Sequence, residues 1–353
     1  MLAAALFGVA AANHGLALLL VPAIGLYVVA VDPGVLRRPR VVVAALGACL
    51  GVAALFYLEL PLRSGILPAP LIYGRPDTWG GFWDVVLARQ FLGGVGGPFA
   101  DLSGKALALL QLANAQFGPL IALVPAGLFI TAVRHPRYAL LSGVAVGITC
   151  FFAASYQNAE IERYYLGPVF FAWTWIGVLV ATVVDAVAER LSPATDDVDG
   201  RTPRGAAPTA AAISLLVGVA LLVPTAAALP DRWAAVDRSA EVWESEWLDQ
   251  AFGTMAPNAV VVSWWSYSTP MWYAQLIDGR RPDVLVVDDR TRLDLGLGDV
   301  APTIDHFLSL GRPVYLMRVT PAEIQDLASR FTIEPVGQPG NLYHVTGRQE
   351  ATP

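Results

Sequence analysis

The stretch "VVVAALGACLGVAALFYLE", residues 41–59, decides the fold class, because it carries no charged side chain before Glu59. About 20 such residues form a helix that crosses the hydrocarbon core of a bilayer. Further runs of the same character lie at 14–31, 115–133, 138–156, 165–187 and 210–229, and residues 1–12 resemble part of another. The sequence therefore predicts an α-helical polytopic membrane domain with about six spans and a partial N-terminal helix.

The composition supports this class. Of 353 residues, 55% are apolar and 15% are charged, against about 25% charged in an average globular domain. The net charge is -6 and the chain has no basic tract, which argues against a nucleic-acid partner. Cys49 and Cys150 both lie in apolar runs, so we expect neither a disulfide nor a metal-ligand spacing. No cofactor is expected, and a divalent metal is the open alternative.

A second domain follows the membrane part. Residues 1–229 form the predicted transmembrane domain, which includes a polar linker at 188–209, and residues 230–353 have a soluble composition. The expected strands are 259–265, 283–289, 313–319 and 341–345, and the expected helices are 240–253, 269–278, 301–310 and 321–330. This alternation predicts a small α/β domain with a largely parallel sheet.

Arginines in the short loops predict the orientation, since cytoplasmic loops are rich in Lys and Arg. One set of loops contains Arg37, Arg38, Arg40, Arg134, Arg137, Arg190, Arg201 and Arg204. The opposite set is poorer, with Arg63, Arg75, Arg89, Lys105 and Arg163. We therefore expect a multi-pass protein of the cell membrane, with its C-terminal domain and the loops at 59–86 and 156–165 on the extracytoplasmic side.

Residues 59–86, "ELPLRSGILPAPLIYGRPDTWGGFWDVV", interrupt the apolar pattern on that outer side. Arg63 and Arg75 are candidates for holding a lipid-linked phosphate, because the guanidinium fork fits phosphate oxygens. The alternatives are headgroup contacts or, for Arg63, an i,i+4 pair with Glu59.

From Asp77 the pattern becomes helical, with an apolar face that includes Trp79 and Trp83 and extends to Phe91. Asp77 is the expected N-cap. This helix is expected to lie in the membrane interface. It is then either a simple aromatic anchor or the wall of a site at the membrane surface.

Three further clusters are candidates. His14 follows an apolar helix end, where it is either a site residue or the first residue of a helix that Asn13 caps. The segment "NAEIERYY" offers Glu160 and Glu162 to orient an acceptor and Arg163 to bind phosphate, unless the carboxylates only favour a helix start. Trp264, Trp265 and Tyr267 follow a strand end, where open α/β sheets bind ligands. They are an acceptor platform or part of the core.

Four blocks in the same order carry a family resemblance. They are "ANHGLALLLVPAIGLYV" (12–28), "FYLELPLRSGILPAPLIYGRPDTWGGFW" (56–83), "NAEIERYYLGP" (158–168) and "SWWSYSTPMWYAQLIDGRRPDVLVV" (263–287). Together they resemble the bacterial branch of the domain-of-unknown-function 2723 family, relatives of the TMEM-type protein O-mannosyltransferases in the GT-C superfamily. The family usually has Asn-His-His at Asn13-His14-Gly15 and Trp-Gly-Asp-Pro at Tyr73-Gly74-Arg75-Pro76.

The resemblance implies transfer of a sugar, mannose being one option, from a polyprenyl-phosphate donor to a protein or glycan acceptor at the outer face. Such transfer needs a carboxylate base, cations for the departing phosphate and a groove for the prenyl tail. Arg63, Arg163 and Arg75 are the expected phosphate ligands, and Trp79, Trp83 and His14 the expected groove. The base candidates are Glu160, Glu162, Asp77 and Glu59.

None of these carboxylates occupies the family's catalytic position, which belongs to an acidic first loop without a counterpart here. We therefore expect the parent protein to be a glycosyltransferase and this chain to be inactive alone. The alternatives are a non-enzymatic protein that binds or moves lipid-linked glycans, and an assembly scaffold.

Overall fold

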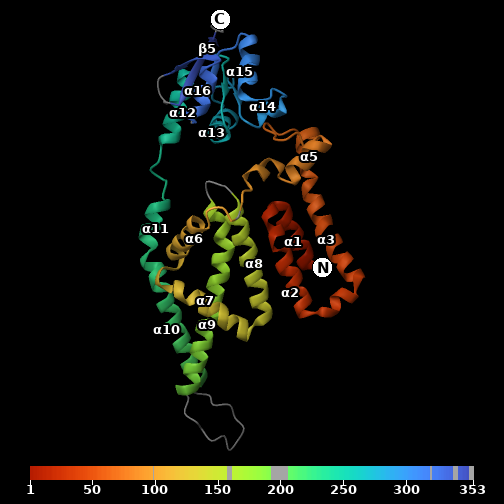
Figure 1. The fold of residues 1–353 in the computed structure, drawn as a ribbon, viewed down its shortest axis with the longest axis vertical. Coiled ribbons are helices and arrows are strands. Elements are labelled where there is room, and N and C mark those ends of the chain that lie inside the picture. Colours follow the sequence, from red (N-terminus) through yellow and green to blue (C-terminus); the bar gives the residue numbers. More distant parts are fainter. Residues whose placement is uncertain (98, 157–160, 192–205, 319, 337–340, 350–353) are drawn as a thin grey trace, which may run out of the picture. The chain divides into compact units, whose positions relative to one another are not determined.

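The computed structural model describes the chain except for residues 98, 157–160, 192–205, 319, 337–340 and 350–353 (Figure 1). Its contacts divide it into two units. The membrane unit comprises Met1–Leu58 and Leu87–Val236, and the C-terminal unit comprises Glu59–Val86 and Asp237–Pro353. The sequence placed residues 59–86 in the membrane domain, whereas their contacts group them with the C-terminal residues.

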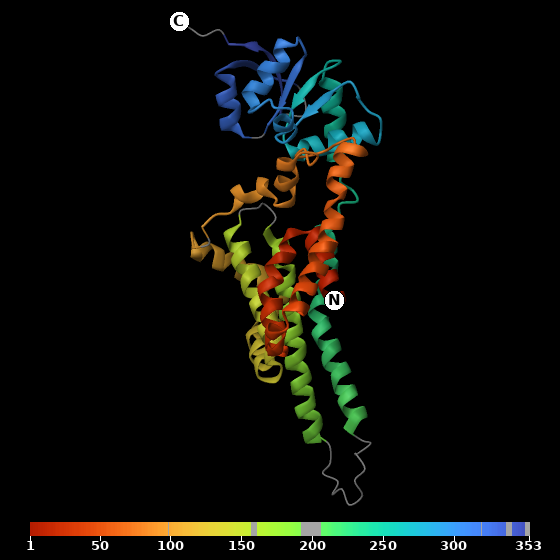
Figure 2. The same ribbon diagram turned by 90° about the vertical axis from the view of Figure 1, so that its right-hand side faces the viewer.

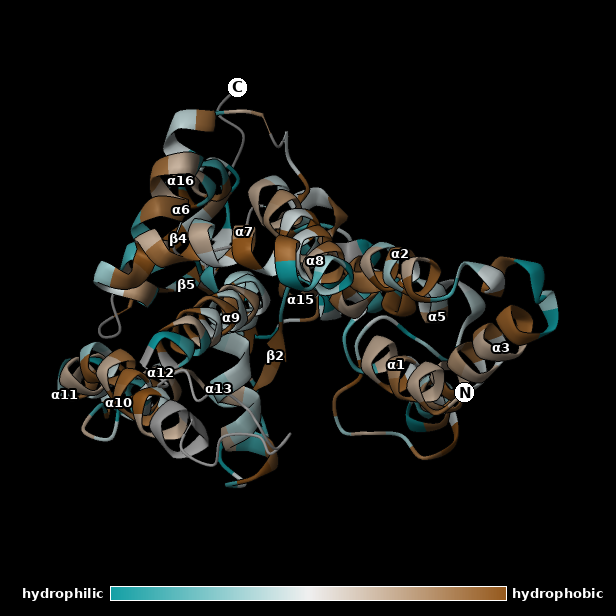
Figure 3. Ribbon diagram, turned by 90° about the horizontal axis from the view of Figure 1, so that it is seen from below, coloured by the Kyte–Doolittle hydropathy of each residue, from teal (hydrophilic) through white to brown (hydrophobic). Residues whose placement is uncertain are grey.

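Apart from loops and one isolated β-bridge, the described part of the membrane unit is helical. The helices are α1 (Leu2–Asn13), η1 (Gly15–Leu20), α2 (Val21–Val31), η2 (Pro33–Arg37), α3 (Pro39–Tyr57), η4 (Arg89–Gly94), α6 (Leu102–Phe117), η5 (Gly118–Ala122), α7 (Leu123–Arg134), α8 (Pro136–Ser155), η6 (Ile161–Tyr165), α9 (Leu166–Leu191), α10 (Ala206–Ala227) and α11 (Leu229–Val236). Figure 3 colours the residues by hydropathy, and hydrophobic residues (brown) recur along these helices.

Five helical stretches of the described chain are long and apolar enough to cross a membrane. They are Pro39–Ile66, Leu102–Arg134, Pro136–Ser155, Ile161–Val187 and Ala211–Val236. Leu2–Asn13 and Gly15–Val31 are shorter apolar helices. The expected run at 14–31 is thus among the shorter ones, and the count of six spans stays a prediction.

Small residues allow two of the helix pairs to approach closely. A Cβ on Gly8 of α1 would lie 2.3 Å from the Cys49 carbonyl oxygen of α3. A Cβ on Gly127 of α7 would lie 2.7 Å from the Trp175 carbonyl of α9. Backbones in such contact gain van der Waals packing, which drives helix association in lipid.

The C-terminal unit is a mixed sheet between helices (Figure 2). The strands are β1 (Val260–Val262), β2 (Leu285–Val287), β3 (Val314–Met317), β4 (Phe331–Pro335) and β5 (Leu342–Arg348), in the order β2-β1-β3-β5-β4. The first three are parallel, whereas β5 is antiparallel to β3 and to β4. The helices are α4 (Glu59–Pro61), η3 (Leu62–Ile66), α5 (Trp79–Val86), α12 (Trp243–Thr254), α13 (Trp265–Leu276), α14 (Thr291–Asp294), α15 (Val300–Ser309) and α16 (Pro321–Ala328).

Alternating side chains give this sheet two apolar faces, because successive residues of a strand point to opposite sides. Val261 and Met317 pack with α12 and α13 in one core cluster. Val260 and Leu316 pack with α15 and α16 in the other. The predicted α/β character is therefore present, but β5 runs opposite to the other strands, so its pairings with β3 and β4 are antiparallel and only the β2-β1-β3 half is parallel.

Candidate functional site

A short bridge joins two segments of the membrane unit where the described part of α8 ends. Val95 and Tyr156 form an isolated antiparallel bridge, and the Gly96 amide donates to the Ser155 carbonyl at 2.6 Å. This bridge positions the loop before α6 beside the end of α8.

The start of α6 contributes two charged side chains to this region. Asp101 caps the helix: its Oδ1 accepts from the Gly104 amide at 3.1 Å and from the Ser103 hydroxyl at 3.3 Å. A Cβ at Gly104 would lie 2.1 Å from the Asp101 carboxylate, so the carboxylate would have to shift if this residue carried a side chain. One residue later, Lys105 Nζ donates to the Gly97 carbonyl at 2.8 Å.

These residues line a chamber with a volume of about 660 Å³, in which polar groups stand among more extensive apolar surface. Its lining comes from residues 96, 97, 100 and 101, from α6, from the end of α8 and from η6. The lining residues are Gly96, Gly97, Ala100, Asp101, Lys105, Ala108, Ala153, Ala154, Ser155, Tyr156, Ile161 and Tyr165.

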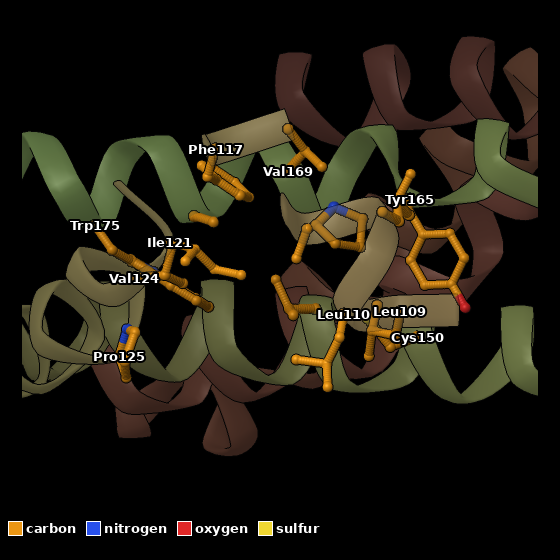
Figure 4. Close-up of a pocket in the computed structure, with 15 residues that line it drawn as sticks. Leu109, Leu110, Phe117, Ile121, Val124, Pro125, Cys150, Tyr165, Val169 and Trp175 are labelled. Atoms are coloured by element: carbon orange, nitrogen blue, oxygen red, sulfur yellow. The ribbon is translucent and has the colours of Figure 1, made fainter. Parts of the chain in front are cut away.

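An apolar groove of about 310 Å³ lies among α6, α7, α8 and α9 (Figure 4). Its lining residues are Leu109, Leu110, Leu112, Ala113, Phe117, Ile121, Val124, Pro125, Val146, Cys150, Tyr165, Pro168, Val169, Ala172 and Trp175. Tyr165 lines both the groove and the chamber. The two cavities therefore share a wall, with the Lys105 ammonium, the Asp101 carboxylate and several hydroxyls on one side and hydrocarbon on the other.

This arrangement suits an amphiphile with an anionic head and an apolar tail. Lys105 can make a charge-assisted hydrogen bond to a head group, and the groove can remove a hydrocarbon chain from water or lipid. Among the described residues, no group of three His, Cys, Asp or Glu side chains could hold a metal ion.

Two of the predicted site residues belong to this region. Glu162 and Arg163 lie in η6, between Ile161 and Tyr165, which both line the chamber. Glu160 lies outside the described residues.

The two arginines of the 59–86 segment are each paired locally in the C-terminal unit. Arg63 Nε lies 3.3 Å from Glu59 Oε1, the i,i+4 pair that was the alternative to a phosphate site. Arg75 donates to Asp77 at 3.1 Å, and this bond holds the pKa of the exposed Asp77 carboxyl below its usual range. Both candidate bases of this segment are thus partners of the candidate phosphate ligands.

The cap of α5 is Thr78 and not Asp77, because Thr78 Oγ1 accepts from the Gly81 amide at 3.1 Å. Trp79 is 78% exposed and packs edge-on against Trp83 at 5.6 Å. The helix ends at Val86 and Ala88 has a φ of 50°, so the expected apolar face does not continue to Phe91.

His14 caps a helix in the membrane unit. Its Nδ1 accepts from the Leu16 amide at 3.2 Å, at the start of η1. One of the two interpretations of the sequence made Asn13 the cap, and the structure places the cap at the next residue.

The three aromatic residues of the predicted acceptor platform have different surroundings. Trp265 is mostly exposed and packs against Trp264 at 6.1 Å. Tyr267 contacts Trp247 at 5.3 Å and packs against the core cluster of α12 and α13. Tyr267 therefore fits the core alternative better than a platform.

Sequence reasoning did not select Asp101, Lys105 or Tyr165. The available signals were that Lys105 is the chain's single lysine and that it follows Asp-Leu-Ser-Gly, a helix-start pattern. What no pattern showed was the packing of α6 against α8 and α9 that makes both cavities.

Comparisons with known proteins leave the resemblance untested. No protein-family model, no curated protein and no solved structure matches this chain.

Proposed function

We propose that this chain is a membrane glycosyltransferase-like protein that binds a polyprenyl-phosphate sugar, with the head group in the chamber beside Lys105 and the prenyl tail in the apolar groove. The observation that carries this proposal is that Tyr165 lines both cavities. The family resemblance supplies the donor class, with mannose as one option, and the transfer to an extracytoplasmic acceptor. The six spans, the cell membrane and the outward C-terminal domain belong to the same proposal.

The chamber offers part of the chemistry that such a transfer needs. Lys105 would stabilise negative charge on the phosphate as the sugar leaves, through a hydrogen bond between two charged groups. Glu162 is the candidate base from η6, and Arg163 is a second candidate cation.

A second function, binding or moving lipid-linked glycans without transfer, is favoured by one observation. Asp101 is the carboxylate in the described lining of the chamber, and it is engaged in capping α6. A capping carboxylate that accepts two hydrogen bonds is a poor general base.

The test measures binding of a radiolabelled polyprenyl-phosphate mannose to the purified full chain in lipid nanodiscs. Replacing Lys105 with Met should weaken binding at least about 10-fold, since a hydrogen bond to a charged group contributes about 1.5–3 kcal/mol. Lys105→Arg should retain most of the affinity. Arg137→Gln removes a charge at the other end of α8 and should leave binding unchanged.

Binding of the prenyl tail in the groove is tested by placing a larger side chain in the groove lining. Leu110 and Leu107 lie on α6 and are 60% and 57% exposed, but only Leu110 lines the groove. Leu110→Trp should weaken binding, and Leu107→Trp should not. Equal affinity of all these variants would refute the site. Sugar transfer to an added acceptor would select the enzyme, and binding without transfer would select the second function.

A further inference from the structure

The carboxyl ends of the parallel strands in the C-terminal unit carry polar residues that the proposed function does not use. Ser263 and Trp264 follow β1, Asp288 and Asp289 follow β2, and Arg318 follows β3. In open α/β sheets, ligands bind in the crevice outside these strand ends.

Asp288 is the most deeply buried carboxylate of this edge. Asp288 is only 1% exposed. Oδ1 accepts from the amides of Arg290 and Thr291 at 3.0 and 2.7 Å. A carboxylate buried to this extent is unfavourable unless donors also satisfy its second oxygen.

The donor to that second oxygen comes from the 59–86 segment. Tyr73 Oη donates to Asp288 Oδ2 at 2.7 Å, and the Tyr73 ring packs edge-on against the buried Trp272 at 5.9 Å. Burial and the hydrogen bond to Asp288 raise the pKa of Tyr73 far above its usual range, so the phenol keeps its proton.

Gly74, the residue after Tyr73, is held at the same edge through its backbone amide. The Gly74 amide donates to Asp294 Oδ2 at 2.9 Å, and Asp294 also pairs with Arg290 at 3.2 Å. Gly74 has a φ of 80°, and a Cβ there would lie 2.9 Å from the Arg290 guanidinium and 2.7 Å from Val85. The conformation and the space at this position therefore both favour glycine.

We propose that the carboxyl edge of this sheet is a receptor site for the chain's own Tyr73–Gly74 turn, so that the α/β domain binds a segment of the protein where related sheets bind small molecules. The site recognises a phenol hydroxyl through Asp288, an aromatic ring through Trp272 and a backbone amide through Asp294. Residues 67–78 are then a tethered ligand of the domain, and docking of this turn is the edge's function.

Hydrogen exchange of the full chain in detergent tests this site. Tyr73→Phe keeps the ring but removes the hydroxyl, and Asp288→Asn removes the charge of the acceptor. Each should speed exchange of amides in 67–78 at least about 5-fold, because loss of one hydrogen bond to a charged group costs about 1.5–3 kcal/mol. The double variant should add little to either single variant, since both remove the same bond.

Tyr57→Phe is the matched control, because its hydroxyl lies 3.5 Å from the Ala11 carbonyl in the membrane unit; it should leave exchange in 67–78 unchanged. Slow exchange in β3 verifies that the domain of each variant is folded. Gly74→Ala should release the same segment without touching the phenol. Unchanged exchange of 67–78 in Tyr73→Phe and in Gly74→Ala would overturn the proposal, whatever the result for the lipid site.

Discussion

At the scale of residues, Arg281 gives a structural role to "RRPDV" (280–284), a part of the fourth block of the family resemblance. Its guanidinium donates to the carbonyls of Phe252, Met255 and Ala256 at the end of α12, and it forms two 2.9 Å bonds with Asp283. These bonds therefore attach the connection between α13 and β2 to the end of α12. Its role here is to build the fold.

The same pair predicts an acid-sensitive contribution to stability. The hydrogen bonds from Arg281, and then that from the Asn258 amide, hold the pKa of Asp283 far below its usual range. A carboxyl with a lowered folded-state pKa stabilises the fold above its unfolded pKa of about 4, and this contribution is lost as the pH falls below that value.

Asp283→Asn should therefore lower the unfolding temperature of the C-terminal unit at pH 7 and flatten its decline between about pH 5 and pH 2.5. Tryptophan fluorescence of the full chain during heating measures both effects. Asp278→Asn, at an exposed carboxylate after α13, is the matched control and should follow the unmodified curve. A decline as steep in Asp283→Asn as in the unmodified chain would contradict this account.

At the scale of elements, the crossing of α7 and α9 depends on a missing side chain. The Cβ of an alanine at Gly127 would lie 2.7 Å from the Trp175 carbonyl, so the two backbones would have to separate. A Cβ on Gly143 of α8, in contrast, would meet no neighbouring atom within 4 Å.

Gly127→Ala should destabilise the membrane unit by about 1–3 kcal/mol, the usual cost of overpacking. Gly143→Ala should be neutral or stabilising by up to about 1 kcal/mol, because alanine restricts the unfolded chain. Thermal unfolding in detergent, followed by circular dichroism, compares the two. Equal stability of both variants would rule out the close crossing.

The elements also show what the sequence could predict. Apolar runs located β1, β2, β3 and β5 and most of the helices, because hydrophobic periodicity is local. The strand β4 was missed because "FTIEP" carries only Phe331 and Ile333 on its buried side and depends on pairing with β5. The prediction that the α5 helix continues to Phe91 was wrong, because Ala88 adopts a left-handed conformation. Alanine gives no sequence signal for this conformation.

The candidate site was predictable only in part, and for a related reason. Glu162 and Arg163 were found because charges stand out beside an apolar run. Lys105 and Tyr165 come together through contacts between helices distant in sequence. The Tyr73 hydroxyl was not selected at all, since its partner Asp288 lies 215 residues away.

At the scale of the whole molecule, the backbone passes between the two units three times, after Leu58, Val86 and Val236. A cut in the exposed loop 237–242 would leave residues 59–86 attached to the membrane unit while they still bind the C-terminal unit. After cleavage at a protease site inserted there, both fragments should therefore elute together in gel filtration. With Tyr73→Phe and Gly74→Ala combined, the C-terminal fragment should elute separately, and its release from the unmutated cleaved protein would argue against this linkage.

The Tyr73–Asp288 bond also sets an order of events during synthesis. At about 5–20 residues per second, the ribosome needs roughly 10–40 s to add the 215 residues that separate the two side chains. Until then the Tyr73 turn has no partner, and helices α6 to α10 are made in between. Closing so long a loop is slow compared with local contacts, so this bond forms late, after the membrane helices between its two partners have been synthesised.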